Sequence, residues 1–218
     1  MKNIPRIFIG TNIGPNAIMP VAKDIAHYLS HVMRRSDCLV FGDGNEYTAT
    51  LNPDGKTIKI GEKTDHIDPS GNIVLYFAPI KRLDDMLNMA TQMGVSKFVP
   101  VITERTVANH VNWERMKKIV TEASEQSNRN SVPEISTLIK FADLPFAELV
   151  FADERAAYGR ELPKEYKNVK NLLVGPEGGF SDSEFEILDK NGAKGLSLGK
   201  TILRAELAAS IAISKVGQ

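Results

Sequence analysis

The chain reads Asn171-Leu-Leu-Val-Gly-Pro-Glu-Gly-Gly-Phe180 at the stretch that decides its fold. The apolar run 172–174 predicts a buried strand, and Pro176 ends it because proline has no N–H to donate to a sheet. Gly178 and Gly179 allow a tight turn, and they let the bare backbone approach another group closely. This stretch therefore predicts a strand that leads directly into a glycine-rich loop.

A helix is expected directly after this loop. Ser181-Asp-Ser-Glu184 fits a capping box, in which each of the two end side chains accepts a hydrogen bond from the other residue's backbone N–H. The helix should run from Asp182 to about Asn191, with Gly192 placed to end it. Strand, glycine loop and capped helix are typical of a small-molecule site at the carboxyl edge of a parallel sheet. An ordinary strand-to-helix connection has the same pattern, so the loop alone leaves both interpretations open.

The known nucleotide-binding glycine motifs do not fit this region. Gly175, Gly178 and Gly179 lack the G-x-G-x-x-G spacing of dinucleotide sites. Gly199-Lys-Thr201 looks like the end of a phosphate loop, but that motif requires glycine at position 194, which is lysine. We therefore expect neither a dinucleotide site nor an ATP site.

Strand and helix patterns alternate from residue 71 onwards. Continuous apolar runs predict buried strands, and apolar residues at helical spacing predict amphipathic helices. The predicted strands are 72–80, 97–102, 149–152 and 172–174, and the predicted helices are 82–93, 113–126 and 203–216. This alternation indicates a parallel α/β sheet with helices on both faces.

The N-terminal part of the chain has a different pattern, in which short strands lie between turns. A helix is expected over residues 22–34 because its apolar residues recur at helical spacing. Gly42-Asp-Gly44 and Asn52-Pro-Asp-Gly55 are turn signals. Short strands at this spacing suggest a small barrel, and His66–Gly71 has the composition of a linker.

The composition excludes several classes of protein. The 218 residues include 27 basic and 27 acidic ones, so any nucleic-acid site must be a local basic patch. The single cysteine, Cys38, excludes an internal disulfide and suits a reducing, cytoplasmic location. No apolar run reaches the length of a membrane span, and the N-terminus has no signal-peptide core, so we expect no membrane association. His27 and His31 have a spacing that could hold a metal on a helix, but no third ligand is near in sequence, so no metal is expected.

Several blocks of the chain match one known family in the same order. They are His27-Tyr-Leu29, Met93-Gly-Val-Ser96, Thr103-Glu-Arg105, Glu125-Gln-Ser-Asn-Arg129, Gly175-Pro-Glu-Gly-Gly-Phe-Ser181 and Leu198-Gly-Lys-Thr-Ile-Leu-Arg204. Through these blocks the chain resembles the ribosomal small-subunit (16S) RNA uridine N3-methyltransferases of the SPOUT superfamily. The resemblance covers nearly the whole chain.

The resemblance implies an α/β fold of two domains. Residues 1–70 would form a small PUA-like RNA-binding β-barrel, and residues 71–218 would form a parallel-sheet SPOUT methyltransferase domain. A C-terminal trefoil knot, which is rare among protein folds, follows from the resemblance alone. A homodimer is expected for a second reason, because helix 203–216 is apolar nearly all round and must be buried on more than one side.

The resemblance also implies a reaction and its site residues. S-adenosyl-L-methionine would donate a methyl group to N3 of a uridine in small-subunit ribosomal RNA. Arg204 would stabilise the uracil anion, and Glu206 would be either a general base or a structural carboxylate that pairs with Arg204 or with a helix N-terminus. Arg6, Arg34 and Arg35 would hold RNA phosphates. Three loops would bind the cofactor through Ala152, Glu154, Val174, Gly175, Pro176, Gly178, Gly179, Leu198, Gly199, Ile202 and Leu203.

Three positions near this site depart from the family pattern. The family usually has arginine at position 201 and threonine at 205 and 207, where this chain has Thr201, Ala205 and Leu207. These departures leave open a catalytically weak or inactive RNA-binding protein that keeps the fold. A transferase that acts on a different small molecule is a third alternative.

Overall fold

The computed structural model describes residues 4–10, 12–42, 44–107 and 111–216. The chain forms two compact units, and each unit takes two pieces of the sequence. Unit 1 comprises Met1–Ser70 and Ser124–Val132, and unit 2 comprises Gly71–Ala123 and Pro133–Gln218. The sequence did not predict that residues 124–132 belong to unit 1.

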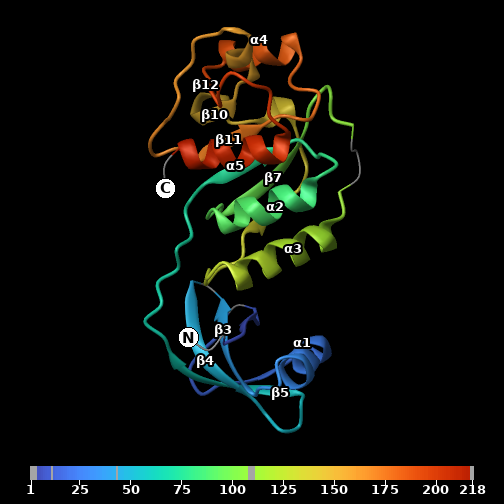
Figure 1. The fold of residues 1–218 in the computed structure, drawn as a ribbon, viewed down its shortest axis with the longest axis vertical. Helices are drawn as coiled ribbons and strands as arrows, with labels where there is room; N and C mark the ends of the chain where they lie inside the picture. Colours follow the sequence, from blue (N-terminus) through green and yellow to red (C-terminus); the bar gives the residue numbers. More distant parts are fainter. Residues whose placement is uncertain (1–3, 11, 43, 108–110, 217–218) are drawn as a thin grey trace. The chain divides into compact units, whose positions relative to one another are not determined.

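Unit 1 contains a five-stranded sheet with the strand order β1-β3-β4-β5-β2 (Figure 1). Strands β1 and β3 are parallel, and the other neighbours are antiparallel. Alternate strand residues such as Val40, Ile58 and Ile60 form a buried core. The strands are β1 (Arg6–Phe8), β2 (Ile18–Pro20), β3 (Asp37–Gly42), β4 (Asn45–Leu51) and β5 (Thr57–Lys63).

Both predicted hairpin turns of unit 1 are confirmed. Strands β3 and β4 end their pairing at Gly42 and Asn45, and Asp43 between them lies outside the described residues. Strands β4 and β5 pair Leu51 with Ile58, and Gly55 in their turn has a φ of 63°. A positive φ is unfavourable for residues with a Cβ, which explains the glycine at this position.

The helix predicted over residues 22–34 is shorter and less regular than expected. Helix α1 (Lys23–His27) continues as a π-helical turn, η1 (Tyr28–Val32). The His27 and His31 rings stack with their centroids 4.5 Å apart. Among the described residues, no group of three or more His, Cys, Asp or Glu is placed to hold a metal ion.

Burial raises the pKa of the Cys38 thiol to about 12, so this thiol stays protonated and unreactive at neutral pH.

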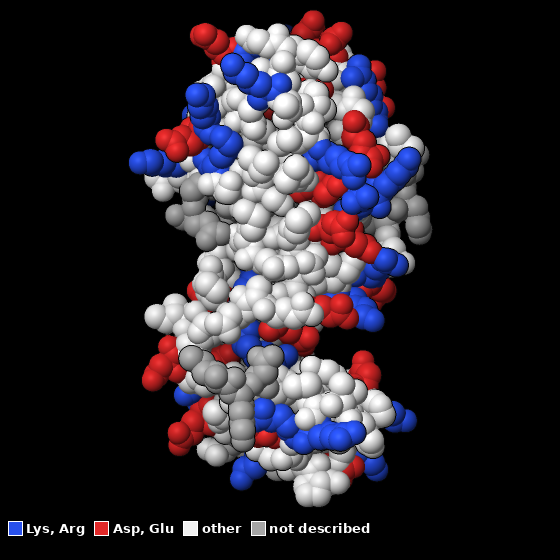
Figure 2. All heavy atoms as spheres, viewed as in Figure 1, with Lys and Arg blue, Asp and Glu red and all other residues white. Residues whose placement is uncertain are grey.

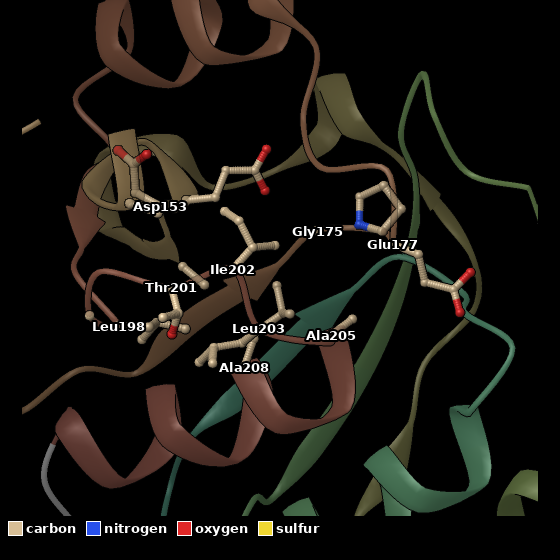
Figure 3. Close-up of a pocket in the computed structure, with 15 residues that line it drawn as sticks. Asp153, Gly175, Glu177, Leu198, Thr201, Ile202, Leu203, Ala205 and Ala208 are labelled. Carbon is tan, nitrogen blue, oxygen red and sulfur yellow. The ribbon is translucent and has the colours of Figure 1, made fainter. Parts of the chain in front are cut away.

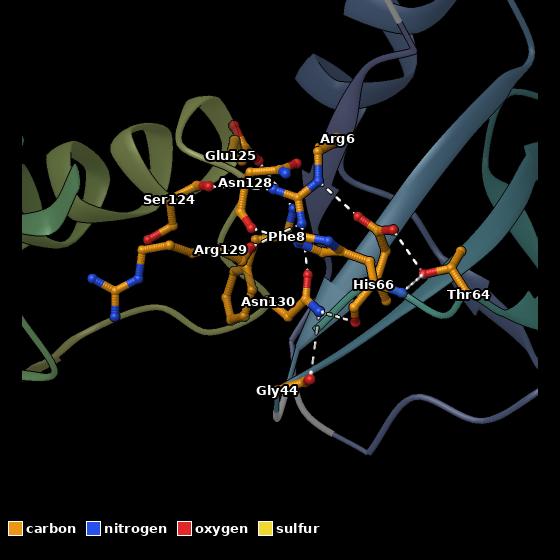
Figure 4. A network of polar contacts seen from close by, with 11 residues as sticks. Arg6, Phe8, Gly44, Thr64, His66, Ser124, Glu125, Asn128, Arg129 and Asn130 are labelled. Carbon is orange, nitrogen blue, oxygen red and sulfur yellow. Dashed lines mark hydrogen bonds and ion pairs between the residues drawn. The ribbon is translucent and has the colours of Figure 1, made fainter. Parts of the chain in front are cut away.

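A polar network ties residues 124–132 to the strands of unit 1 (Figure 4). The Arg6 guanidinium bonds Glu46 at 2.8 Å and Asn130 Oδ1 at 2.7 Å, and it also donates to the carbonyl oxygens of Ser124 and Arg129. The Arg6 and Glu46 side chains are only 9% and 5% exposed. This arrangement speaks against the expectation that Arg6 binds an RNA phosphate, because protein acceptors already occupy its N–H groups. We therefore assign Arg6 a structural role.

Unit 2 contains the predicted parallel α/β sheet. Its strand order is β12-β10-β11-β6-β7-β8, and every neighbouring pair is parallel. Strand β8 pairs with the start of β7, and β9 pairs with the end of β7. The predicted strand 72–80 is ordered as a strand only over β6, although residues 78–80 are also buried. The strands are β6 (Val74–Phe77), β7 (Lys97–Ile102), β8 (Glu134–Ile135), β9 (Ile139–Lys140), β10 (Leu149–Ala152), β11 (Asn171–Val174) and β12 (Lys194–Leu196).

Helices pack on the sheet of unit 2. Phe185 and Leu188 of α4 share a buried core with Phe151 and Leu173 of the sheet. Helix α5 packs on α2 and on strands β10 and β11. The helices are α2 (Leu83–Gln92), α3 (Trp113–Gln126), α4 (Asp182–Lys190) and α5 (Ala205–Lys215), and short 3₁₀ turns occur at η2 (Phe141–Asp143), η3 (Phe146–Glu148) and η4 (Glu154–Tyr158). None of the described helices is long and apolar enough to cross a membrane.

The capping box that precedes α4 is confirmed. Ser181 Oγ accepts from Glu184 N at 3.2 Å, and Glu184 Oε2 accepts from Ser181 N at 2.9 Å. The helix ends at Lys190, close to the predicted Asn191, and Gly192 follows with a φ of 82°. These local contacts fix the direction in which the chain leaves the glycine-rich loop.

Candidate functional site

A pocket lies where three loops of unit 2 meet (Figure 3). Strands β10 and β11 are parallel neighbours, and so are β10 and β12, so the loops that follow all three begin at the same edge of the sheet. The pocket has about 560 Å³ of empty space, part of which is open to solvent. We call it the C-terminal pocket. Its lining residues are Ala152, Asp153, Glu154, Ala157, Val174, Gly175, Pro176, Glu177, Leu198, Gly199, Thr201, Ile202, Leu203, Ala205 and Ala208.

The structure brings most of the predicted cofactor residues together in this pocket. Ala152 ends β10 and Glu154 follows it, Val174 ends β11 and leads into Gly175 and Pro176, and Leu198 to Leu203 belong to the loop after β12. Gly178 and Gly179 do not line the pocket. The small lining residues Ala157 of η4 and Ala208 of α5 were not predicted, because their spacing in the sequence carries no signal.

Two glycines of the loop are required by close packing. A Cβ on Gly175 would lie 3.0 Å from the Phe180 ring, and a Cβ on Gly179 would lie 2.0 Å from Glu154 Oε1. Gly179 also has a φ of 67°, which residues with a Cβ rarely adopt. Gly178 differs, because a Cβ there would make only an ordinary contact at 3.6 Å with Arg105. Close backbone approach is therefore a property of Gly179 and not of Gly178.

The pocket contains two adjacent carboxylates in different environments. Asp153 is fully buried and bonds the Arg155 guanidinium, with Nη2 to Oδ2 at 2.7 Å and Nε to Oδ1 at 2.8 Å. Within the described part of the chain, the Glu154 side chain makes no hydrogen bond or ion pair. Burial, and next the charge of Asp153, raises the pKa of Glu154 above its ordinary value. Of these two neighbouring carboxylates, Glu154 is therefore the one that remains available to a ligand.

Arg105 supports the glycine-rich loop from outside the pocket. Its Nη1 donates to the carbonyl oxygens of Gly178 at 3.0 Å and Phe180 at 3.1 Å. The backbone N–H of Glu104 donates to Glu184 Oε1 at 2.8 Å, so the same carboxyl group caps α4 and binds the loop after β7. Arg105 belongs to the Thr103-Glu-Arg105 block of the family resemblance, but its contact with the glycine-rich loop was not predicted.

The two residues predicted to act in catalysis lie at the start of α5. Arg204 is the N-cap residue and is exposed, and its side chain makes no hydrogen bond or ion pair with any described residue. Glu206 in the first turn is 8% exposed, and its Oε1 lies 3.8 Å from Arg82 Nε. The partner of Glu206 is therefore Arg82 and not Arg204.

The remaining residues predicted to bind RNA belong to unit 1. Arg34 is exposed and has a φ of 52°, directly after the π-helical turn. Arg35 is partly buried and pairs with Asp37, with Nε to Oδ1 at 2.9 Å. Figure 2 shows basic and acidic side chains interspersed on the face in view, as the balanced total charge leads one to expect.

Comparison with known proteins places these observations in a family. Residues 68–217 match the family model described as an RNA methyltransferase domain. The chain is 34% identical over 229 residues to a Ribosomal RNA small subunit methyltransferase E of Rickettsia conorii, covering 97% of this chain and 94% of that protein. It is 32% identical over 184 residues to the protein of the same name from Aquifex aeolicus, covering 78% of this chain and 80% of that one.

A solved structure is similar over nearly the full length. It is a Ribosomal RNA small subunit methyltransferase E from Neisseria gonorrhoeae bound to S-adenosyl methionine. The two chains are 27% identical with a TM-score of 0.82, and the match covers 97% of this chain and 96% of that one.

Proposed function

The chain belongs to the RNA methyltransferase family, and we propose that it methylates N3 of a uridine in small-subunit ribosomal RNA with S-adenosyl-L-methionine as the methyl donor. The observation that carries this proposal is the C-terminal pocket. Three loops that are distant in sequence converge on it, and all three lie within the region that the family model matches. The names of the relatives support ribosomal RNA as the substrate.

The chemistry of the lining supports S-adenosyl-L-methionine as the ligand of the C-terminal pocket. Val174, Leu198 and Leu203 supply apolar walls for an adenine ring, and Gly175 and Gly199 leave backbone groups accessible. Glu154 can accept hydrogen bonds from hydroxyl or amino groups of the ligand. When bound, the cofactor supplies a methyl group that is activated by its sulfonium.

Calorimetry with alternative ligands tests the cofactor assignment. S-adenosyl-L-methionine and S-adenosylhomocysteine should bind, whereas ATP and NAD should not, because the phosphate-loop and dinucleotide spacings are absent. Tight binding of ATP without any response to S-adenosylhomocysteine would contradict the assignment.

In this proposal, Arg204 stabilises the negative charge that develops on the target base. N3 of uracil holds a proton at neutral pH, so the protein must stabilise the negative charge that develops as this proton leaves. A guanidinium stays charged and offers several donors in one plane, which suits the uracil oxygens. Arg204 is exposed and uncommitted among the described residues beside the pocket that holds the donor. Glu206 could serve as the general base, but its burial against Arg82 favours a positioning role.

The arrangement of the whole protein is part of the same proposal. Unit 1 would be a PUA-like barrel that binds RNA through Arg34 and Arg35, and the C-terminal part of unit 2 would be threaded as a trefoil knot. The protein would act in the cytoplasm as a homodimer. Leu207 supports the dimer, because it is 46% exposed on a helix that is apolar nearly all round.

Ribosomal RNA from cells tests this function. Nucleosides of small-subunit RNA from cells with and without the gene should differ by one N3-methylated uridine, as measured by mass spectrometry. If the two RNA samples are identical although the purified protein binds S-adenosyl-L-methionine, the catalytically inactive alternative is favoured. Methyl transfer to a free metabolite would favour the small-molecule alternative.

A further inference from the structure

A second cavity of unit 2 adjoins the C-terminal pocket. It has about 900 Å³ of empty space, part of it open to solvent, and is lined by Lys81, Arg82, Glu177, Ile202, Leu203, Arg204, Ala205 and Glu206. Four of these residues, Glu177, Ile202, Leu203 and Ala205, also line the C-terminal pocket. The two hollows therefore share one wall, and a molecule in the second lies directly beside a molecule in the first. We call the second hollow the basic cavity.

The sheet explains why these residues meet. Strands β6 and β11 are parallel neighbours that pair Phe77 with Val174, so the loop containing Lys81 begins beside the loop containing Gly175. Ala78 N donates to Val174 O at 3.1 Å and keeps the two strands together at their carboxyl ends. In Figure 3 the Glu177 side chain extends towards the segment that leads into α2.

Two of the three cations of the basic cavity have no partner among the described residues. Lys81 and Arg204 make no hydrogen bond or ion pair with any residue that the structure describes. Arg82 lies 3.8 Å from both Asp85 and Glu206, which is too long for hydrogen bonds. The lining contains these three cationic side chains and the two carboxylates of Glu177 and Glu206, so its net charge is one positive.

Two further features of the cavity suit a nucleotide. Helices α2 and α5 both begin here, with Arg82 and Arg204 as their N-cap residues, so the positive ends of two helix dipoles add to the side-chain charge. Ile202 is 59% exposed on the wall shared with the C-terminal pocket. An exposed apolar side chain beside cationic side chains matches a flat base joined to an anionic phosphate.

We propose that the basic cavity is the subsite for the target nucleotide of the RNA, with Lys81 and Arg82 holding its phosphodiester. This inference rests on the proposed function and adds to it two residues and the chemical group that they bind. The base of an extruded uridine would then lie against Ile202, with Arg204 at its oxygens. Lys81 does not line the C-terminal pocket, so its contribution is to the RNA and not to the cofactor.

The test combines RNA binding with methyl transfer. Lys81→Ala and Lys81→Glu are compared with the wild type and with Lys118→Ala, a control that removes an exposed lysine of α3. The probe is small-subunit ribosomal RNA from cells that lack the gene. We expect Lys81→Ala to raise the KM for RNA roughly tenfold, as for the loss of one charge-assisted contact, and Lys81→Glu to raise it further. Affinity for S-adenosyl-L-methionine should stay within about twofold of the wild type.

Salt dependence gives a readout that does not require turnover. Loss of one phosphate contact should reduce the slope of log K for RNA against log salt concentration by about 0.7–0.9. Unchanged slope and KM in both Lys81 variants, with an active wild type, would overturn the inference and leave the proposed function intact. A parallel loss of cofactor affinity would also overturn it, because Lys81 would then act through the fold. If the wild type binds RNA with a slope that depends on Lys81 but transfers no methyl group, the proposed function fails, and only the contact of Lys81 with an RNA phosphate stands.

Discussion

Arg204 is the residue on which the proposed chemistry depends most. Arg204→Ala should lower kcat about a hundredfold to a thousandfold, the usual effect of removing one preorganised donor from a developing anion. Cofactor affinity and melting temperature should change little, because the side chain is exposed and binds no described residue. Arg204→Lys should restore activity only in part, since a point charge cannot replace a planar set of donors.

The rival role for Arg204 is structural. If Arg204 mainly held α5 in place, Arg204→Ala would lower the melting temperature and the cofactor affinity together with the rate. A rate at saturating substrate equal to that of the wild type would end the catalytic assignment.

Gly179 and Gly178 form a matched pair of substitutions in one loop. Gly179→Ala should weaken cofactor binding and lower the free energy of unfolding by about 1–2 kcal/mol, because it places a Cβ in a left-handed conformation. The new Cβ would also lie 2.0 Å from Glu154 Oε1 and displace that side chain. Gly178→Ala should change both quantities much less, because its Cβ would lie 3.6 Å from its nearest neighbour, Arg105. Calorimetry and urea unfolding of the two variants measure the difference, and equal effects would contradict this assignment.

Glu154 should make stability depend on pH. Burial and the charge of Asp153 raise its native pKa above the ordinary value of 4.5, so between these two values the native state binds more protons than the unfolded chain. The contribution of Glu154 to the free energy of unfolding therefore falls as pH rises through this interval. Glu154→Gln removes that loss, so the ligand-free variant should gain stability over the wild type as pH rises above 4.5. Urea unfolding at several pH values measures the difference in free energy of unfolding between the variant and the wild type. A difference that stays constant with pH would refute the raised pKa of Glu154.

At the scale of elements, the loop after β7 should stabilise the glycine-rich loop. Arg105→Ala removes the two hydrogen bonds to the carbonyl oxygens of Gly178 and Phe180. We expect the free energy of unfolding to fall by about 1 kcal/mol and cofactor affinity to fall several-fold. Arg115→Ala is the control, because it removes an exposed arginine of α3 that pairs with Asp84. Equal cofactor affinities in the two variants would show that Arg105 does not position the loop.

Elements with strong local signals could be predicted from the sequence. The capping box at Ser181 and Glu184 set the start of α4, because both of its hydrogen bonds form within four consecutive residues. The short strands β8 and β9 were missed, because two residues cannot show a periodic pattern. The role of Arg6 was also missed, because its partners Ser124 and Asn130 lie more than a hundred positions away in the sequence.

The candidate site shows the same division between local and distant signals. The loops at Gly175 and Leu198 could be found from their glycines and from the family resemblance. The pairing of Glu206 with Arg82 could not be predicted from the sequence. It requires α2 and α5 to pack together, and no local sequence pattern indicates that contact.

At the scale of the whole molecule, α5 should provide a contact between two copies of the chain. Leu207→Asp should shift sedimentation at micromolar concentration towards a monomer, because it places a charge on an apolar, 46% exposed position of this helix. Ile187→Asp is the control, since Ile187 is similarly exposed at 40% but lies on α4. A wild-type protein that sediments as a monomer would refute the homodimer.

Transfer of a labelled methyl group is the direct test of uridine methylation by this protein. The purified protein is incubated with small-subunit ribosomal RNA from cells lacking the gene and with S-adenosyl-L-methionine that carries a trideuterated methyl group. The RNA is then digested to nucleosides for mass spectrometry. We expect labelled 3-methyluridine with the wild type and a strongly reduced yield with Arg204→Ala. The absence of label from the RNA, or label on any nucleoside other than uridine, would contradict it.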